Sequence, residues 1–559
     1  MGEALRVTAV VFKDGHDTLA ARVLLCPDGK DDAEEVVDMT SLGNDEWEAV
    51  VVPRRIGPHS VVVQGWTART RYSETPDPDT APDLTSSDPQ PLWVDRERAL
   101  FGAWYELFPR SFGGFSGVSG RVPALAAMGF DVLYLPPIHP IGVTARKGPN
   151  NTLAARPGDP GSPWAIGSVE GGHTAIHPDL GTVEDFAGLV EDLKAHGMEI
   201  ALDYALQCSP DHPWVTEHPE WFHHRPDGSI ACAENPPKIY QDIYPINFWP
   251  PSEESRIELW EACEEIVEYW IGLGVRIFRV DNPHTKPMAF WEWLIASVQS
   301  RHPEVLFLAE AFTRPKVMSR LAEAGFSQSY TYFTWRTAQH GPEGLRAYLE
   351  ELAHGPVADY MRPNFWPNTP DILSGPLRHG PPAAFALRLV LAATMSPSYG
   401  VYSGFELYEN IPASDTNEEY LNSEKYEIKH REFDRPASLA PLMSVLNQIR
   451  RRHPALQRLR SILFHDTTNP EIIAYSKRSD DGEDAVLTVV TLDPHRPQEA
   501  TLHLDLDALG LPRDRAYAVV DELSGETYRW RGSEPYVRLD PVFRVAHVLD
   551  LAGGGVPTW

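Results

Sequence analysis

The chain has 559 residues, of which 42% are hydrophobic, and its 79 acidic residues against 49 basic ones give a formal charge of -30 at pH 7. This length exceeds what one hydrophobic core supports, so about three or four units are expected, one of which can be a large α/β barrel. The acidic excess disfavours nucleic acid as a partner, because phosphate backbones are bound through Lys and Arg.

The same composition constrains location and metal binding. No early segment has a basic start followed by a long apolar run, and no run approaches the ~18 apolar residues of a membrane span, so neither secretion nor a membrane partner is expected. A cytoplasmic protein is therefore predicted. The four cysteines lack the close paired spacing of zinc sites and are expected to be free thiols.

Residues 1–72 contain short β-branched runs separated by Gly, Asp, Asn and Pro clusters, which is typical of a small β-sandwich. Residues 73–97 follow, and their Pro, Asp, Ser and Thr content up to position 91 predicts a linker or an extended strap.

From residue 98 to 456 strands and helices alternate. The apolar runs are WYELFPRSF, DVLYLPPI, EIALDYAL, VRIFRVD, VLFLAEAF and PSYGVYSGF, and helical stretches are expected at 183–196, 253–273 and 383–395. In the second helix Ser252 can cap the start, and Gly272 with Gly274 ends it. This alternation predicts an α/β fold with a parallel sheet, most economically a (β/α)8 TIM barrel.

Two further regions depart from this rhythm. Residues 207–250 are rich in His, Pro, Asp and Trp without clear periodicity, and they are too long for a βα loop, so they predict a subdomain inserted over the active face. Residues 457–559 return to strand patterns and predict a C-terminal β-domain.

The chemistry is expected where two of the barrel strands end. Side chains two apart in a strand share a face, so Arg279 and Asp281 point the same way, and Glu310 ends the next strand along the chain. Neighbouring parallel strands bring both acids to the C-terminal rim, where enzymes of this fold keep their sites. An ionised nucleophile beside a protonated acid suits retaining glycoside chemistry, although a helix-capping Asp and a surface Glu would also explain the pattern.

A resemblance narrows this reading. The run HTAIHPDLGTVEDFAGLVEDLKAHGMEIALDYAL, together with FRVD, AEAF, NTPD and MSPSYGVYSGFE, resembles the ordered motifs of the α-amylase family. The words RKGPNN, SPWAIGS, ALQCSPDHPWV, RVDNPHTKP, LAEAFTRP and NSEKYEIKHR are more specifically similar to the α-1,4-glucan:maltose-1-phosphate maltosyltransferases. The similarity is strong over residues 98 to 450 and extends to the flanking β-domains in layout.

The resemblance implies three catalytic carboxylates. Asp281 would be the nucleophile, Glu310 the general acid/base and Asp371 the carboxylate that holds sugar hydroxyls in the transition state. Two histidines common in amylases are replaced here by Cys208 and by Thr369–Pro370. Those histidines grip the sugar ring in amylases, so simple starch hydrolysis is disfavoured.

Beside the nucleophile, Arg279 would keep Asp281 ionised and Asn282 can donate to the donor's phosphate, so both are expected at the substrate site. The resemblance adds further contacts. The phosphate would meet Asn235, Lys238 and Tyr240 in the inserted subdomain, and the donor's sugars would meet Lys147, Gln207, Lys425 and Tyr426. His284 and Lys286 lie near Asp281 in sequence and could either act on substrate or support the rim.

Other aromatic and histidine residues are expected to be structural. The histidine-rich stretch 211–224 lacks an i,i+4 His pair on a helix, so zinc is disfavoured. The tryptophans that could stack on sugars, although burial is the commoner explanation for any one of them, are Trp164, Trp214, Trp249 and Trp366.

The sequence therefore favours a retaining transferase that moves a maltosyl unit from α-maltose 1-phosphate to an α-1,4-glucan acceptor without metal or cofactor. The alternatives are an amylase-like hydrolase or an enzyme of another glycosyl phosphate, and a non-catalytic glycan-binding barrel. The family usually carries a helical bundle that is inserted within the N-terminal region and contributes to its dimer. Here the first β-domain leads through residues 73–91 directly toward the barrel, and no segment there has helical periodicity, so any homodimer is expected to be weaker or rearranged.

Overall fold

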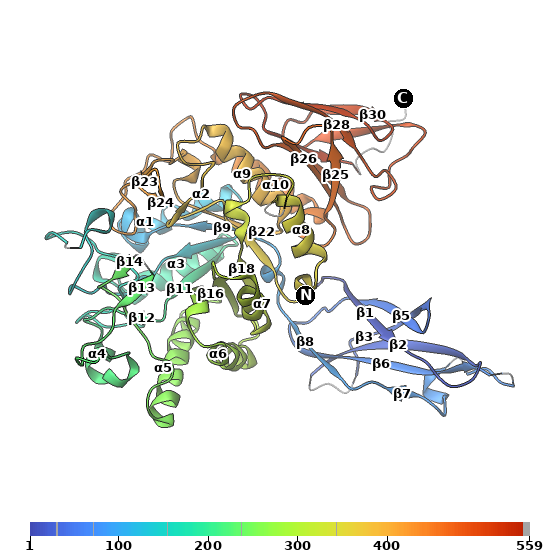
Figure 1. Ribbon diagram of the computed structural model, residues 1–559, viewed down its shortest axis with the longest axis horizontal. Coiled ribbons are helices and arrows are strands. Elements are labelled where there is room, and N and C mark those ends of the chain that lie inside the picture. Colours follow the sequence, from blue (N-terminus) through green and yellow to red (C-terminus); the bar gives the residue numbers. More distant parts are fainter. Residues whose placement is uncertain are drawn as a thin grey trace. The chain divides into compact units, whose positions relative to one another are not determined.

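The computed structural model describes residues 1–28, 32–70, 72–75, 77–153, 155–235, 238–341 and 344–551. The chain divides into two compact units, one formed by Met1–Ala99 with Gln299–Glu304 and the other by Leu100–Val298 with the remainder of the chain from Val305. Figure 1 shows strands in the first unit and both helices and strands in the second.

The first unit is a β-sandwich. One sheet holds β1 (Leu5–Val10), β5 (Glu46–Val51) and β4 (Thr40–Gly43), and the other holds β3 (Glu35–Asp38), β2 (Thr18–Pro27), β6 (Gly57–Arg69) and β7 (Thr85–Ser86). Val23 and Leu25 of β2 pack with Val51 of β5 in the core between the sheets. The alternation of β-branched residues therefore marks the inward face, as the sequence predicted.

The predicted linker is partly wrong. Within 73–97, β7 and β8 (Gln90–Val94) both pair with β6, and Pro78–Thr80 forms a short 3-10 turn. Proline lacks an N–H, so within sheets it occurs in edge strands, at strand starts and at bulges, and Pro91 lies in β8 opposite Ser60 of β6. The Pro-rich composition therefore reflects edge strands of the sandwich as well as connecting loop.

The second unit confirms the predicted TIM barrel. Within the described residues, eight parallel strands close on themselves in the order β10-β11-β16-β17-β18-β19-β22-β9. Their bounds are β9 (Gly102–Glu106), β10 (Val132–Leu135), β11 (Glu199–Tyr204), β16 (Ile277–Asp281), β17 (Leu306–Glu310), β18 (Gln328–Tyr330), β19 (Pro363–Phe365) and β22 (Ser398–Tyr402).

Helices surround these strands (Figure 1). They are α1 (Phe115–Ser119), α2 (Val122–Ala127), α3 (Val183–Ala195), α5 (Glu253–Gly272), α6 (Met288–Arg301), α7 (Pro315–Glu323), α8 (Leu345–His354), α9 (Pro382–Met395) and α10 (Ala440–Arg452). The hydroxyl of Ser252 accepts from the backbone N–H of Ser255, which confirms the predicted cap of α5. Thr182 and Asp185 form a reciprocal capping box at the start of α3.

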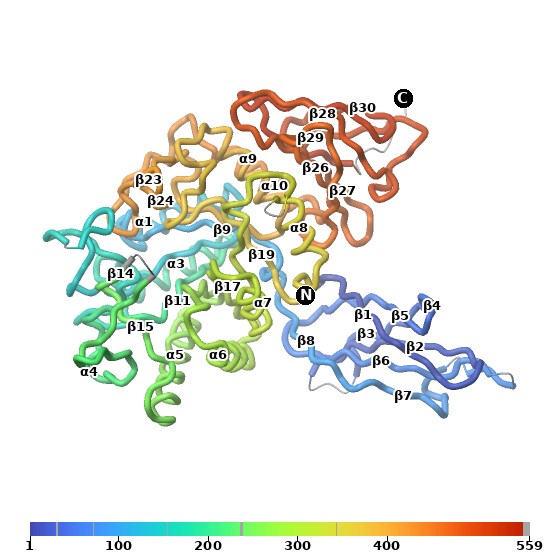
Figure 2. The backbone as a smooth tube through the Cα atoms, viewed as in Figure 1, coloured from blue at the N-terminus to red at the C-terminus, as the bar shows by residue number. Residues whose placement is uncertain are grey.

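The long excursions leave the barrel where its strands end. Residues 207–250 lie between β11 and α5 and contain α4 (Pro213–Glu217), a pairing of β12 (Gln207–Cys208) with β15 (Tyr244–Pro245), and the hairpin of β13 (Ala233–Asn235) and β14 (Lys238–Tyr240). Two short hairpins follow later, β20 (Asn368–Thr369) with β21 (Ile372–Leu373) and β23 (Pro412–Ser414) with β24 (Asn417–Tyr420). In Figure 2 residues 207–250 lie in the green part of the tube and residues 412–420 in the orange part.

The C-terminal strands belong to the same compact unit as the barrel. They are β25 (Leu463–Thr467), β26 (Ile472–Arg478), β27 (Ala485–Thr491), β28 (Gln498–His503), β29 (Ala516–Asp521), β30 (Thr527–Arg531), β31 (Tyr536–Leu539) and β32 (Ala546–Asp550). The hydroxyls of Thr394 on α9 and Tyr475 on β26 form a buried hydrogen bond at 2.6 Å, which joins barrel and sheet. Among the described residues, none of the helices combines the length and apolar character that crossing a bilayer requires.

Candidate active site

The acids predicted on neighbouring strands lie opposite each other. In the parallel pairing of β16 with β17, Asp281 is the register partner of Glu310, and both residues end their strands. Asp371 lies in the turn between β20 and β21, beyond the end of β19. All three carboxylates line one cavity of about 630 Å³. The barrel rim therefore gathers the carboxylates that the sequence singled out.

One buried guanidinium links the acids. Arg279 donates from Nη1 to Asp281 Oδ1 at 2.9 Å and to Asp203 Oδ2 at 3.0 Å, and its Nη2 lies 3.6 Å from Glu310 Oε1. Asp203 is also the register partner of Arg279 on β11. Buried charges are stable only when they are paired, so this cation fixes the positions of three carboxylates.

The two rim acids have opposite pKa shifts. Burial alone would raise the pKa of Asp281, but the Arg279 guanidinium and then the Lys286 ammonium outweigh it and hold that pKa below its usual value. Burial raises the pKa of Glu310 to about 8, and the negative charge of Asp281 adds to this against the opposing effect of Arg279. At neutral pH the site therefore offers one ionised and one protonated carboxyl group.

The peptide after Asp281 is held in an unusual conformation. Asn282 adopts left-handed backbone angles (φ 44°, ψ 53°), which Asn tolerates better than most residues. Lys286 Nζ donates to the main-chain oxygens of Asp281 at 3.0 Å and of Asn282 at 3.3 Å, and the Thr285 hydroxyl donates to the latter at 2.8 Å. Lys286 thus secures the rim, and it also lines the cavity.

The remaining walls come from distant loops. Lys425 forms an ion pair with Asp371, and its Nζ lies 5.4 Å from the centre of the Trp164 ring. Gln207 donates to the main-chain oxygen of Trp164 at 3.3 Å. The inserted subdomain contributes several lining residues, namely Gln207, Cys232, Ala233, Glu234, Tyr240, Asp242, Ile243, Pro245, Ile246 and Phe248.

The structure brings most of the predicted contact residues together. The cavity is lined by Gln207, Tyr240, Asn282, Lys425 and Tyr426. Asn235 and Lys238 belong to the paired strands β13 and β14, and their side chains lie outside the described residues.

Two predicted substrate contacts are placed elsewhere. Lys147 is buried with its Nζ donating to Gln241 Oε1 at 2.5 Å, and it is not part of the lining. Arg279 lies behind the carboxylates and contacts them rather than the cavity. Both cations therefore shape the site from behind its surface, because each already has protein partners in the interior.

Sequence reasoning missed some residues of the site. Asp203 interrupts the apolar run EIALDYAL, and a carboxylate in a barrel strand was a usable signal, because a buried acid needs a cation. Burial raises the pKa of Asp203 to about 7, against the lowering effect of Arg279. Phe312 and Glu419 also line the cavity, but Phe312 lies in the loop after β17 and Glu419 in the four-residue strand β24, and neither segment has a periodic pattern.

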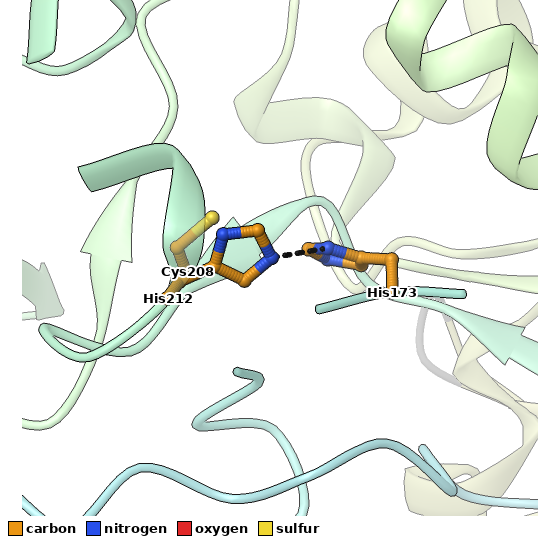
Figure 3. Close-up of side chains that lie close together, drawn as sticks. All are labelled: His173, Cys208 and His212. Atoms are coloured by element: carbon orange, nitrogen blue, oxygen red, sulfur yellow. Dashed lines mark hydrogen bonds between the residues drawn. The ribbon is translucent and has the colours of Figure 1, made fainter. Parts of the chain in front are cut away.

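A histidine cluster lies beside this region (Figure 3). His173, Cys208 and His212 are buried, and their ligand atoms lie within 4.8 Å of one another. The backbone N–H of Trp214 donates to His212 Nδ1, so the ring proton of His212 is on Nε2. That nitrogen donates to His173 Nδ1 at 3.1 Å. His173 Nε2 in turn donates to the main-chain oxygen of Ala205 at 3.0 Å.

These bonds use both nitrogens of each ring, so neither imidazole has a lone pair for a metal while the chain of bonds is intact. Burial lowers the pKa of His173 to about 4 and that of His212 to about 2, which keeps both rings neutral. The cluster is therefore a hydrogen-bonded support for residues 205–208, a segment that includes Gln207 of the cavity lining.

Comparisons with known proteins agree with this geometry. Residues 1–72 match a family model described as "Alpha-1,4-glucan:maltose-1-phosphate maltosyltransferase, domain N/S", and residues 464–551 match one described as "GLGE, C-terminal". Alpha-1,4-glucan:maltose-1-phosphate maltosyltransferase 2 of Streptomyces coelicolor is 50% identical, over 98% of this chain and 93% of that relative. A Mycolicibacterium smegmatis maltosyltransferase of the same description is 54% identical, over 84% of this chain and 68% of that relative.

Solved structures share the fold. A cyclomaltodextrinase superposes with a TM-score of 0.61 at 17% identity, covering 98% of this chain and 96% of that one. An α-amylase from Lactobacillus plantarum gives 0.60 at 20% identity, covering 81% and 100%. The barrel, the three carboxylates at its rim and a sequence identity of 50% over 98% of the chain lead to one conclusion, that the chain belongs to the family of the α-1,4-glucan:maltose-1-phosphate maltosyltransferases.

Proposed function

We propose that this protein is a retaining glycosyltransferase that moves a maltosyl unit from α-maltose 1-phosphate to the non-reducing end of an α-1,4-glucan and releases phosphate. The observation that carries the proposal is the register pairing of Asp281 with Glu310 in one cavity, with one group ionised and the other protonated. Membership of the maltosyltransferase family supplies the donor and the acceptor.

The first half-reaction breaks the bond to phosphate. Asp281 attacks the anomeric carbon from the face opposite the leaving group, and the bond between that carbon and the bridging oxygen breaks. Glu310 gives its proton to the bridging oxygen, so phosphate departs and a β-maltosyl ester remains on Asp281. Arg279 keeps the nucleophile ionised until attack, because protonating Asp281 would forfeit their ion pair.

The second half-reaction forms the new α-1,4 bond. The acceptor's 4-hydroxyl attacks the anomeric carbon, and the now ionised Glu310 removes its proton. The ester bond to Asp281 breaks, and the two inversions give overall retention. Asp371, which forms an ion pair with Lys425, would bind sugar hydroxyls during both steps. None of these steps calls for a metal or a cofactor.

Selection of a phosphate donor would rest on groups near the nucleophile. Tyr240, Asn282 and Lys286 line the same cavity as Asp281, and the resemblance adds Asn235 and Lys238. One ammonium about 6 Å from one unit of phosphate charge, at an effective dielectric of 20, contributes roughly 3 kcal/mol, or about a hundredfold preference over a neutral leaving group. Lys238→Ala should therefore raise KM for the donor, whereas Lys316→Ala on exposed α7 should not.

The sugar-binding part of the proposal uses four residues. Gln207, Lys425 and Tyr426 line the cavity near Asp371, and the aromatic and amide groups suit the faces and hydroxyls of a sugar. Lys147 would act indirectly, by holding Gln241 next to Asp242 of the lining.

The decisive experiment is incubation with α-maltose 1-phosphate and maltohexaose. The proposal expects products longer by two glucose units as phosphate appears, and no phosphate with Asp281→Ala. Reducing sugar released from starch without phosphate would instead indicate a hydrolase. Binding of glucan without any turnover would indicate a non-catalytic barrel. The presence of all three carboxylates argues against that alternative.

Assembly and location are also part of the proposal. The alignment with the S. coelicolor relative runs over 631 positions against 559 residues here, so parts of that relative have no counterpart in this chain. We expect the unmatched positions to include the family's helical bundle, and any homodimer to be weaker or rearranged. Light scattering after size exclusion tests it, and a tight, concentration-independent dimer would refute it. A role in α-glucan synthesis follows from the proposed reaction, and the cytoplasmic location expected from the sequence stays a prediction.

A further inference from the structure

Of the four tryptophans that the sequence raised as sugar-stacking candidates, one is exposed. Trp164 and Trp366 are buried, and Trp214 stacks against the His173 ring. Trp249 leaves 51% of its surface in water. A single exposed apolar residue is ordinary by itself, so what surrounds Trp249 decides whether it has a function.

The segment that carries Trp249 separates two hollows. Ile246 and Phe248 line the active-site cavity. Asn247 and Pro251 line a second, open groove of about 510 Å³, whose other walls come from residues 219–220 and 222–224 of the inserted subdomain. Residues 246–251 therefore form a shared wall, and a chain leaving the cavity over this wall would meet Trp249.

Trp249 is held in place by its neighbours. Its backbone N–H donates to Asn247 Oδ1 at 3.1 Å, and the Arg256 guanidinium lies 5.3 Å from the centre of the Trp249 ring. Trp260 of α5 meets the Trp249 ring at 5.8 Å in an edge-to-face arrangement and donates to the main-chain oxygen of Phe248 at 3.3 Å. An aromatic surface fixed before binding loses little conformational entropy when a ligand covers it.

The chemistry of the groove suits a neutral polyhydroxylated chain. Its walls combine Pro219, Phe222 and Pro251 with the polar side chains of Glu220, His223 and Asn247. Apolar rings pack against the C–H faces of sugars, while carboxylate, imidazole and amide groups bond to hydroxyls. The described lining of the groove holds a carboxylate and no lysine or arginine, and Arg256 beside Trp249 pairs with Glu253 at 3.2 Å, so an anionic ligand is disfavoured.

We propose that Trp249 and this groove, lined by residues 219–220 and 222–224, Asn247 and Pro251, bind the α-1,4-glucan where it extends beyond the active-site cavity. The assignment of an α-1,4-glucan, as opposed to another neutral glycan, rests on the proposed function. The groove would hold long chains against the enzyme between transfers and favour them over short ones, because only long chains reach both hollows at once.

The test separates binding from chemistry. In the full chain carrying Asp281→Asn, mobility in native gels containing glycogen measures binding without turnover. Adding Trp249→Ala should weaken glycogen binding about fivefold to tenfold, and Trp249→Phe should retain most of it. Phe543→Ala, which removes another exposed aromatic residue, should leave mobility unchanged. Equal melting temperatures would show that the variants are folded.

A kinetic measurement adds a second readout. With Asp281 intact, Trp249→Ala should raise KM for maltoheptaose relative to KM for maltotriose. Glycogen mobility and this KM ratio both equal to those of the parent would overturn the inference, even if transfer from α-maltose 1-phosphate is confirmed. Loss of glycogen binding by Trp249→Ala in a protein that shows no such transfer would support the groove while the proposed function fails.

Discussion

Asn282 ties the two rim carboxylates together, since its backbone N–H donates to Glu310 Oε2 at 3.2 Å while its side-chain amide lies 3.4 Å from Asp281 Oδ2. One residue in the left-handed conformation thus touches both acids. Their relative position is therefore set by the backbone of the rim as well as by Arg279.

Substitutions at Asn282 should separate its side chain from its backbone. Asn282→Gly removes the amide but keeps the left-handed conformation accessible, whereas Asn282→Ala removes the amide and strains the backbone. We expect kcat/KM for the donor to fall about tenfold to a hundredfold in the Gly variant and further in the Ala variant. Equal losses in the two variants, measured by phosphate release, would mean that the backbone conformation contributes nothing.

The opposite shifts at the acids predict a pH profile. The first half-reaction needs Asp281 ionised and Glu310 protonated, so kcat/KM for the donor should fall about tenfold per pH unit above about 8. Its acid limb should lie at low pH, because the pKa of Asp281 is held below its usual value. Phosphate release from about pH 3 to 10 covers both limbs, and the donor's own phosphate ionises near pH 6, between them.

Glu310→Gln provides the control for that assignment, since glutamine cannot donate the proton. The variant should lose both most of its activity and the alkaline limb. A limb near pH 8 that persists in the residual activity of Glu310→Gln would assign the titration to another group.

Lys286 is expected to act through the rim rather than on the substrate alone. Lys286→Met would release the main-chain oxygens of Asp281 and Asn282 and remove a positive charge from the nucleophile. We expect kcat to fall about tenfold to a hundredfold and the acid limb to move to higher pH, because the pKa of Asp281 rises without the ammonium. Lys316→Met on exposed α7 is the matched control. An acid limb that does not move would contradict this electrostatic role.

Much of the fold was predictable because its strands are long enough to show a pattern. The six apolar runs named from the sequence correspond to six barrel strands, while β18 and β19 were missed. Each of those has three residues and contains polar side chains, Gln328 and Ser329 in one and Asn364 in the other. A strand of this length has no periodicity to detect.

The contacts of the site likewise fall into those that the sequence predicts and those that it does not. The adjacency of Asp281 and Glu310 follows from consecutive strands in a parallel barrel, and the register confirms it. The pairing of Lys425 with Asp371 and the packing of Trp164 beside Lys425 join loops that are far apart in sequence. Such contacts depend on how irregular loops fold over the rim, and spacing along the chain does not encode that.

Gly400 offers a test of packing inside the barrel. A Cβ atom at this position of β22 would lie 2.3 Å from Cζ2 of Trp366, whose ring stacks on Tyr330 at 5.1 Å. The Tyr330 ring lies 5.8 Å from the Arg279 guanidinium, so a displacement of the Trp366 ring would reach the active site through Tyr330. Gly400→Ala should lower the free energy of unfolding by about 1–3 kcal/mol, because a rigid ring in a packed core cannot move aside cheaply.

The control for Gly400 is Gly188→Ala. Gly188 lies in α3, has no neighbour within 4 Å of an added Cβ and has no positive φ. That substitution should be neutral or stabilising by about 0.5–1 kcal/mol, since alanine favours helix. Urea denaturation of both variants checks the pair, and a fully stable Gly400→Ala would show that Trp366 yields to the added methyl group.

His453 predicts a pH dependence of stability where α10 meets the C-terminal sheet. Its Nδ1 lies 2.8 Å from Asp484 and its Nε2 lies 3.9 Å from Glu522, with Asp550 adding to the negative field. Burial opposes its charging, but the bond to Asp484 and these carboxylates raise its pKa above the ordinary value. Because the pKa of His453 is higher in the folded state than in the unfolded state, the stabilisation that its charged form provides is fully present below about pH 6.5. It is lost as the pH rises through the folded-state pKa.

The urea midpoint should therefore fall from pH 6 to about pH 8.5 in the parent, and the fall should be smaller in His453→Gln, which keeps a donor but does not titrate. Arg452 bonds to Glu522 from the same helix and does not titrate in this range, so it leaves the difference between the two proteins unaffected. An identical pH dependence in parent and His453→Gln would show that the carboxylates around His453 do not stabilise its charged form.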